Sequence, residues 1–190
     1  MSQIKRVLVT GGNGYVGNYF IKTMALRYPD IEVVGMSRRG TARSDDPVTK
    51  KLQNVSFIKG DCLKPDSLSD SIQDVDAIIH TVGILFESRK DPQRTYAAVN
   101  RDAAINMAKI LNKSAEEQAV KKNFVMVGSE KAPPFLSAYL DTKLEAENYI
   151  TTQCAHLKPT MLRPGFIVDK AHRSWSPIVG FLNDANFEAY

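Results

Sequence analysis

This sequence has few cysteines and no long apolar run. Its 190 residues include two cysteines, Cys62 and Cys154. Their separation matches neither a metal-ligand nor a redox motif, so we expect free thiols in a reducing compartment. No apolar stretch reaches the length of about 18 residues that a transmembrane helix needs, and we therefore expect none. The first predicted strand begins near Ile4, which leaves no room for a signal peptide or presequence. We expect that such a segment is either not needed or absent from this sequence.

The chain also has only a small excess of charge of one sign. The net charge of +4 is spread along the chain, and the absence of a basic run with interleaved aromatic residues argues against a nucleic-acid partner. The pairs Lys50–Lys51 and Lys121–Lys122 are interpreted as solvated faces. A hydrophobic fraction of 43% and a charged fraction of 24% are ordinary for one globular domain with a substantial core. A mild positive charge would favour the approach of an anionic cofactor.

Strand-like and helix-like segments alternate along the chain. The predicted strands are residues 5–10, 32–37, 55–59, 77–81, 123–128 and 160–162. The predicted helices are residues 15–27, 64–73, 93–112 and 138–153, and the polar segment 38–53 is predicted as a loop with one short helix. This alternation predicts an α/β fold with a doubly wound parallel sheet of strand order 3-2-1-4-5-6. Ligands of such sheets bind at the carboxyl ends of the strands.

The first predicted strand ends in a glycine-rich turn. Residues 10–17 read Thr-Gly-Gly-Asn-Gly-Tyr-Val-Gly, which contains both G-x-x-G-x-x-G and G-x-G-x-x-G spacings. Missing side chains allow a tight turn and let backbone N–H groups approach a pyrophosphate, while the N-terminus of the next helix adds partial positive charge. A purely structural turn is the alternative. We predict that the turn binds a dinucleotide through Gly11, Gly12, Asn13, Gly14, Tyr15, Val16 and Gly17.

The other strand ends extend this predicted site. The second strand ends in Ser37-Arg38-Arg39, without the acid that usually binds the ribose 2′-hydroxyl of NAD. Guanidinium groups can bind a 2′-phosphate, so this end favours NADP(H) over NAD(H); a solvated arginine pair is the alternative. Asp61 can accept a hydrogen bond from adenine, or it can cap the helix that Pro65 opens. The remaining predicted cofactor-binding residues at these strand ends are Cys62, Thr81, Val82, Gly83, Pro164 and Gly165.

A tyrosine and a lysine share one face of the last predicted helix. Tyr139 and Lys143 are four residues apart, so both side chains lie on the same face. A phenol has a reference pKa of about 10, and a nearby ammonium lowers it and can also bind the cofactor ribose. Ser129 ends the fifth strand and can hydrogen-bond a substrate carbonyl oxygen. Asn100 in the preceding helix can hold a water or a backbone carbonyl in a proton relay. These four residues form the candidate catalytic group.

Together these motifs resemble the extended, atypical members of the short-chain dehydrogenase/reductase family. The segments that carry the resemblance are residues 10–17, Asp61, residues 98–100, Ser129, Tyr139 with Lys143, and residues 163–165. The resemblance implies an NAD(P)-binding Rossmann domain over residues 1–165 and the remnant or start of a C-terminal substrate lobe over residues 166–190. Ser129 precedes Tyr139 by 10 residues, slightly fewer than is usual in the family. Aromatic residues of the lobe either complete the core or form a quinone or lipid surface.

A narrower resemblance concerns one mitochondrial branch of this family. The segments that carry it are residues 60–67, 80–85 and 163–166, followed by Asp169 and His172-Arg173. This branch contains an accessory protein of the coenzyme Q biosynthetic complex and is related to the nucleotide-binding accessory subunit of respiratory complex I. The resemblance implies a matrix-side protein of the mitochondrial inner membrane with either complex as a partner. Cytoplasmic localisation is the alternative.

Two kinds of function stay open on the sequence. The first is an NADP(H)-binding protein that acts in, or organises, ubiquinone biosynthesis. The second is an active NADPH-dependent oxidoreductase or epimerase on a small carbonyl substrate, or an accessory subunit of complex I. Among the other candidates, His80 is expected to be a hydrogen-bonded core residue and Cys154 a small core residue. His156 and His172 lack metal-ligand spacing, so no metal site is predicted.

Overall fold

The structure is a computed structural model, and it describes residues 4–43, 46–88, 90–132, 134–165 and 167. The lobe predicted over residues 166–190, with its aromatic residues, lies outside the described residues except for Ile167. The predicted domain over residues 1–165 is described almost completely.

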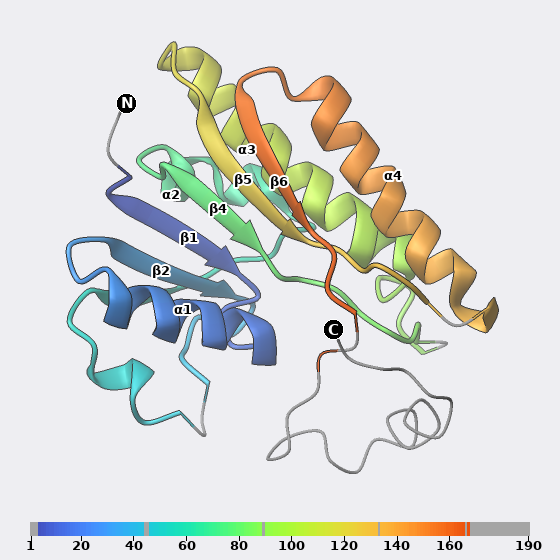
Figure 1. The fold of residues 1–190 in the computed structure, drawn as a ribbon, viewed down its shortest axis with the longest axis horizontal. Coiled ribbons are helices and arrows are strands. Elements are labelled where there is room, and N and C mark those ends of the chain that lie inside the picture. The colour runs from blue at the N-terminus through green and yellow to red at the C-terminus, as the bar shows by residue number, and fades with distance from the viewer. Residues whose placement is uncertain (1–3, 44–45, 89, 133, 166, 168–190) are drawn as a thin grey trace.

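Six parallel strands form one sheet in the order β3-β2-β1-β4-β5-β6, which confirms the predicted topology (Figure 1). The strands are β1 (Arg6–Thr10), β2 (Glu32–Ser37), β3 (Val55–Lys59), β4 (Ala77–His80), β5 (Lys122–Val127) and β6 (Leu157–Leu162). The last strand begins three residues earlier than predicted. It lies at the edge of the sheet, where a proline such as Pro159 is tolerated because its missing N–H faces no partner strand.

The strand ends meet along one edge of the sheet. Thr10 of β1 lies beside Met36 of β2 and His80 of β4, and His80 in turn lies beside Met126 of β5. Because all strands are parallel, the segments that follow them gather at this same edge. The glycine-rich turn, the arginine pair after β2 and the tyrosine–lysine helix are therefore brought to one side of the molecule.

Helices cover both faces of the sheet. Figure 1 shows α1 (Tyr15–Arg27) on one face and α3 (Ala103–Glu117) and α4 (Ser137–Gln153) on the other. The helix predicted over residues 64–73 is instead a short 3-10 turn, Pro65–Ser67, followed by the four-residue helix α2 (Ser69–Ile72). The helix predicted over 93–112 begins with a π-helical turn, Ala97–Asp102, and continues as α3 five residues further than expected.

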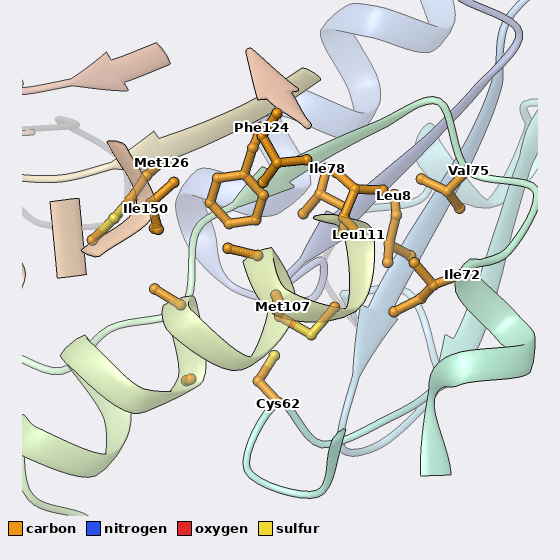
Figure 2. Packing of buried hydrophobic residues seen from close by; sticks show 14 of the residues in the cluster. Leu8, Cys62, Ile72, Val75, Ile78, Met107, Leu111, Phe124, Met126 and Ile150 are labelled. Carbon is orange, nitrogen blue, oxygen red and sulfur yellow. The ribbon is translucent and has the colours of Figure 1, made fainter. Parts of the chain in front are cut away.

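Two hydrophobic clusters fill the spaces between the sheet and its helices. Successive side chains of β1 alternate between them, as a strand requires: Val7 and Val9 pack with Ile21 of α1, whereas Leu8 packs with the α3 side. Figure 2 shows the larger cluster, in which Met107, Leu111, Phe124 and their neighbours are buried. Both cysteines are free and buried in this larger cluster, which confirms the core role predicted for Cys154.

The prediction that Lys122 belongs to a solvated face is wrong. Lys122 starts β5 and is 4% exposed. Its ammonium donates to the carbonyl of Gln73 at 3.0 Å and to Oγ of Ser114 at 2.9 Å. Burial lowers the pKa of this lysine. Lys121 beside it is exposed, as predicted.

Within the described ranges, no helix combines the length and the apolar composition that crossing a bilayer requires. The same residues contain no group of three or more His, Cys, Asp or Glu side chains placed to hold a metal ion.

Candidate functional site

The glycine-rich turn joins β1 directly to α1. Gly11 has a φ of 77°, in the left-handed region that glycine adopts without strain. The N–H of Gly14 donates to the carbonyl of Gly11 at 2.8 Å, and the N–H of Asn18 donates to Gly14 at 3.0 Å as the first bond of the helix. A Cβ at Gly17 would collide with the carbonyl oxygen of Gly11. The turn can therefore close this tightly only with glycine at positions 11 and 17.

The geometry of this turn fits a pyrophosphate. The backbone N–H groups of residues 15–17 precede the first intrahelical bond and face out of the N-terminus of α1. The first turn of α1 contains no acidic residue, so no carboxylate opposes an anion there. Gly14 is exposed, and a Cβ built on it would meet only the Gly11 carbonyl oxygen, at 3.0 Å. Contacts of residues 11–17 with a cofactor stay a prediction.

The end of β2 places arginines next to this turn. The N–H of Gly12 donates to the carbonyl of Met36 at 2.9 Å, which ties the turn to β2. Ser37 is buried and its Oγ accepts a hydrogen bond from the N–H of Gly40, so its side chain shapes the loop. Arg38 and Arg39 follow and are exposed. Their guanidinium groups are available to an anion at this edge.

The loop after these arginines is anchored to α1 through Asp46. Oδ2 of Asp46 accepts a hydrogen bond from Nδ2 of Asn18 at 2.6 Å. Burial alone would raise the pKa of Asp46, but hydrogen bonds from Asn18, Thr49 and Val48 lower it to about 2. The carboxylate therefore stays charged at neutral pH and holds the loop in place.

Asp61 and Cys62 follow β3. Oδ1 of Asp61 accepts the N–H of Leu63 at 3.0 Å, so its side chain stabilises the turn before Pro65. It does not cap the 3-10 turn itself, whose N-cap is Lys64 without a side-chain cap. Burial, together with the charge of Asp61, raises the pKa of Cys62 to about 12. The thiol therefore stays protonated and is no nucleophile at neutral pH.

The chain after β4 runs between the glycine turn and the candidate catalytic group. Oγ1 of Thr81 donates to the carbonyl of Thr10 at 2.7 Å, so Thr81 lies against the end of β1. Val82 packs against the larger core cluster. A Cβ at Gly83 would lie 3.3 Å from Oδ1 of Asn100 and 3.4 Å from Nζ of Lys143. The Asn100 and Lys143 side chains thus meet at this segment.

Lys143 is the buried centre of the candidate catalytic group. It is 5% exposed, and its Nζ donates to the carbonyl of Val127 at 3.0 Å. The same Nζ lies 5.5 Å from the centroid of the Tyr139 ring. Burial lowers the pKa of Lys143 to about 8, and the charge of Glu147 opposes that decrease. The lysine is therefore mostly an ammonium at neutral pH, and this cation lies near the Tyr139 ring.

Asn100 and Ser129 are held by backbone groups. Asn100 is 1% exposed and lies in the π-helical turn. Its Oδ1 accepts the N–H of Ile84 at 2.8 Å and its Nδ2 donates to the carbonyl of Ile84 at 3.1 Å, so both ends of the amide fix that residue. Oγ of Ser129 donates to the carbonyl of Lys131 at 2.9 Å, within its own loop. Asn100 thus lies with Lys143 beside Gly83, whereas the hydrogen bond of Ser129 stays within its own loop.

Residues 163–165 follow β6, the strand at one edge of the sheet. The carbonyl of Pro164 accepts the N–H of Glu130 at 3.2 Å, which holds this segment beside the end of β5. Gly165 is exposed.

Residues 7–164 match the NAD dependent epimerase/dehydratase family. This chain belongs to that family. The match runs from the second residue of β1 to two residues past the end of β6, and it includes the glycine turn, Tyr139 and Lys143. The chain therefore has the Rossmann fold of the NAD-dependent epimerases and short-chain dehydrogenases/reductases.

Curated relatives of this family member include proteins of different kinds. MIOREX complex component 2 of Saccharomyces cerevisiae is 27% identical, over 92% of this chain and 76% of that protein. Phenylcoumaran benzylic ether reductase TP7 of Nicotiana tabacum is 26% identical, over 88% of this chain and 55% of the enzyme. Eugenol synthase 2 of Clarkia breweri is 28% identical, over 87% and 54% respectively. The chain spans about half the length of these two enzymes.

Solved structures share the fold of this epimerase/dehydratase-family domain. A short-chain dehydrogenase of Leptospira borgpetersenii with bound NAD+ has a TM-score of 0.69 at 19% identity, covering 88% of this chain and 73% of that one. The Bordetella bronchiseptica enzyme WbmG in complex with NAD has a TM-score of 0.59 at 20% identity, covering 85% and 53%. With the family assignment, these structures support a nicotinamide dinucleotide as the cofactor of this fold.

Several residues near the candidate site were not predicted from the sequence. The Tyr96 ring lies edge-on to the Tyr139 ring with centroids 6.0 Å apart, and its hydroxyl donates to the carbonyl of Leu85 at 2.8 Å. The guanidinium of Arg43 lies 6.0 Å from the centroid of the Tyr15 ring in the glycine turn. Glu147 could have been found, because it continues the four-residue spacing of the tyrosine and the lysine along α4. No comparable signal marks Arg43 in its polar loop.

His80 is a core residue, as predicted. It is 1% exposed, and its Nδ1 shares a hydrogen bond of 2.9 Å with Oγ1 of Thr10. Burial, with a smaller contribution from the charge of Lys143, lowers the pKa of His80 to about 3. The ring is therefore neutral at physiological pH and adds no charge to the site.

Proposed function

We propose that this chain is an NADP(H)-dependent oxidoreductase domain that acts in mitochondrial ubiquinone biosynthesis, with Tyr139 and Lys143 as its proton-transfer pair. The observation that carries the proposal is the buried Lys143 ammonium beside the Tyr139 ring, on the edge of the sheet where the glycine turn lies. A nucleotide site used for structure alone needs the turn but has no need of a buried cation beside a phenol. The ubiquinone pathway and the mitochondrial setting rest on the resemblance of residues 60–67 and 80–85 to the coenzyme Q branch.

Each residue of the group has a definite task in this proposal. When bound, a nicotinamide dinucleotide would supply the hydride. The hydroxyl of Tyr139 gives its proton to the carbonyl oxygen of the substrate, and the Lys143 ammonium stabilises the phenolate that remains. Burial strengthens this attraction, because charges interact more strongly where water is excluded. Asn100 fixes Ile84 and with it the segment beside Lys143, and Ser129 orients the carbonyl oxygen once its hydroxyl leaves the Lys131 carbonyl.

The preference for NADP(H) is supported by the charge at the end of β2. Arg38 and Arg39 are exposed directly after the strand, and the tie between Gly12 and Met36 places this end next to the glycine turn. Arg43, packed over Tyr15, adds a third cation at the same edge. A 2′-phosphate can bind such guanidinium groups through paired N–H donors.

Replacing the Tyr139 hydroxyl tests the proposal. Tyr139→Phe removes the proton donor and keeps the ring that packs against Tyr96. Turnover should fall by about 100-fold or more, as expected for loss of a general acid, while NADPH binding by calorimetric titration stays unchanged. NADPH oxidation would be followed with a short-chain ubiquinone analogue and a panel of small aldehydes and ketones.

A matched control is available on the same helix. Tyr149 packs against the core and beside Lys109, far along α4, so Tyr149→Phe should leave turnover unchanged. If Tyr139→Phe turns over as fast as the unmodified protein, the catalytic proposal is wrong.

A second candidate is a structural role in a multiprotein complex. The observation that favours it is the relative named as a component of the MIOREX complex, which this chain matches over 92% of its length. In that role a bound dinucleotide stabilises the fold by mass action. Affinity purification from isolated mitochondria, with bound proteins identified by mass spectrometry, should then recover a defined assembly. Coenzyme Q biosynthetic proteins and complex I subunits are two possible outcomes. Recovery of the same assembly with Tyr139→Phe, together with normal respiration, would favour this role over catalysis.

A further inference from the structure

Helix α4 carries a third ionisable side chain in line with the tyrosine and the lysine. Tyr139, Lys143 and Glu147 follow one another at intervals of four residues, so they share one face of the helix. Glu147 is 4% exposed, although a buried carboxylate is costly without partners. Its environment therefore needs an explanation.

Arg163 provides one partner of this carboxylate. Nε and Nη2 of Arg163 donate to Oε2 of Glu147 at 2.8 and 2.6 Å. The guanidinium comes from the segment just after β6, and the Arg163 side chain is 54% exposed. Arg163 thus fixes the carboxylate from the solvent side. The other oxygen, Oε1, is buried and has no hydrogen-bond partner among the described residues.

The free oxygen of Glu147 lies against the end of β5, where Lys143 also binds. A Cβ at position 128 would collide with Oε1 of Glu147, so glycine at this position gives the carboxylate its place. The preceding residue, Val127, supplies the carbonyl that accepts Nζ of Lys143. Glu147 and Lys143 therefore converge, from one face of the helix, on the last residue of β5 and the glycine that follows it.

This arrangement has an electrostatic consequence for Lys143. Burial lowers the pKa of the lysine to about 8, and Glu147 is the charge that raises it against burial. Of the other titratable groups near Lys143 in the described structure, His80 on β4 is neutral above about pH 3, and Tyr139 on α4 is a phenol. The Arg163 cation lies beyond Glu147 and is largely solvated.

We propose that Glu147 is a positioning residue: clamped by Arg163, its carboxylate places a negative charge at the end of β5, where it attracts the Lys143 ammonium and favours the charged form of that lysine. This inference rests on the proposed function, in which a charged Lys143 stabilises the Tyr139 phenolate. It assigns to the Glu147–Arg163 pair the task of setting the charge of the site, in addition to joining α4 to the chain after β6.

The titration of Lys143 itself tests this role without substrate or cofactor. Protein labelled with carbon-13 at lysine Cε would be titrated by NMR, with Lys143→Arg used to assign the signal. We expect a midpoint at about 8 in the unmodified protein. In Glu147→Gln the midpoint should fall by about one pH unit or more, as expected on loss of a close opposite charge.

A matched control lies two residues away on the same helix. Glu145 is 54% exposed and pairs with Arg101 at 3.0 Å, on the outer face of α4. Glu145→Gln makes the same change of charge and should leave the Lys143 midpoint where it is. An unchanged midpoint in Glu147→Gln would overturn the proposal and leave Glu147 a purely structural residue.

Two further measurements keep the outcome decisive. If Glu147→Gln does not fold, the double variant Glu147→Gln/Arg163→Gln removes the guanidinium left without a partner, and its Lys143 midpoint should fall in the same direction. NADPH titration of the unmodified protein is measured in parallel. Absence of NADPH binding would refute the proposed function, while the Lys143 midpoint would still decide the role of Glu147.

Discussion

Substituting the glycines of the β1–α1 turn one at a time should separate folding from cofactor binding. Gly17 is buried, and a Cβ there would meet the backbone oxygen and carbon of Gly11 as well as Oγ1 of Thr81. Gly14 is exposed, has φ −75° and ψ 168°, and offers one close neighbour, the Gly11 carbonyl oxygen at 3.0 Å. The same change, glycine to alanine, therefore meets two different environments three residues apart.

The magnitudes follow from these contacts. At Gly17 the clash is with backbone atoms that cannot turn away, so the cost lies in the upper part of the range of about 1–3 kcal/mol for overpacking. The higher helix propensity of alanine returns about 1 kcal/mol, leaving a net loss of about 1–2 kcal/mol in the free energy of unfolding. At Gly14 the backbone is extended and suits alanine, so stability should change by less than about 1 kcal/mol.

The affinity for NADPH should change most clearly in Gly14→Ala, because this variant is expected to keep its stability. A methyl group on Gly14 stands at the mouth of the turn and keeps a pyrophosphate from the backbone N–H groups of α1. Losing one hydrogen bond to a charged group costs about 1.5–3 kcal/mol, or roughly 10- to 100-fold in Kd. Gly14→Ala should therefore bind NADPH at least tenfold more weakly while remaining folded.

Two measurements check this prediction. Urea denaturation without cofactor gives the free energy of unfolding of Gly14→Ala and Gly17→Ala, and calorimetric titration with NADPH gives their affinities. NADPH binding by Gly14→Ala as tight as that of the unmodified protein would contradict the expected loss of affinity. Unfolding of Gly17→Ala at the same urea concentration as the unmodified protein would contradict the expected loss of stability.

Two further predictions concern charge. Arg38→Ser/Arg39→Ser should weaken NADPH binding by about tenfold or more and leave NADH binding unchanged, since only the 2′-phosphate loses partners; Arg27→Ser at the far end of α1 is the control, and equal losses for both coenzymes would contradict the assignment. For His80, the unfolded chain gains a proton below about pH 6.5 that the folded ring does not gain until about pH 3. The free energy of unfolding should therefore fall with pH in this window, and between about pH 7 and 5 the unmodified protein should lose roughly 2 kcal/mol more than His80→Asn does. Urea denaturation at both pH values measures this difference, and identical losses would rule the mechanism out.

The regular part of this fold is readable from the sequence because burial and turn chemistry agree there. Residues 15–27, 32–37 and 55–59 form the elements predicted for them, to the residue. In each case an apolar pattern begins and ends at a glycine, proline or polar cluster. The strand order follows from the handedness of parallel crossovers, and the structure has that order.

Local patterns could not predict the features that depend on tertiary contacts. Lys122 looks like half of a solvated pair, but the carbonyl of Gln73 and the hydroxyl of Ser114 give its ammonium partners inside the fold. The break between Pro65–Ser67 and α2 is invisible in a segment whose residues all tolerate a helix. Arg163 was recognised as part of a motif, yet its bond to Glu147 crosses from one element to another and needs the structure to be seen.

The π-helical turn Ala97–Asp102 affects how this chain can be compared with others. Such a turn accommodates one more residue than the same length of regular helix. Each residue of a regular helix advances by about 100° around the axis, so an ungapped alignment with a protein that lacks the widened turn rotates one of the two flanking segments by that angle. The residue that corresponds to Asn100 in another protein should therefore be identified by its two bonds to the residue that corresponds to Ile84. An alignment with a single-residue gap within 97–102 should be tested first.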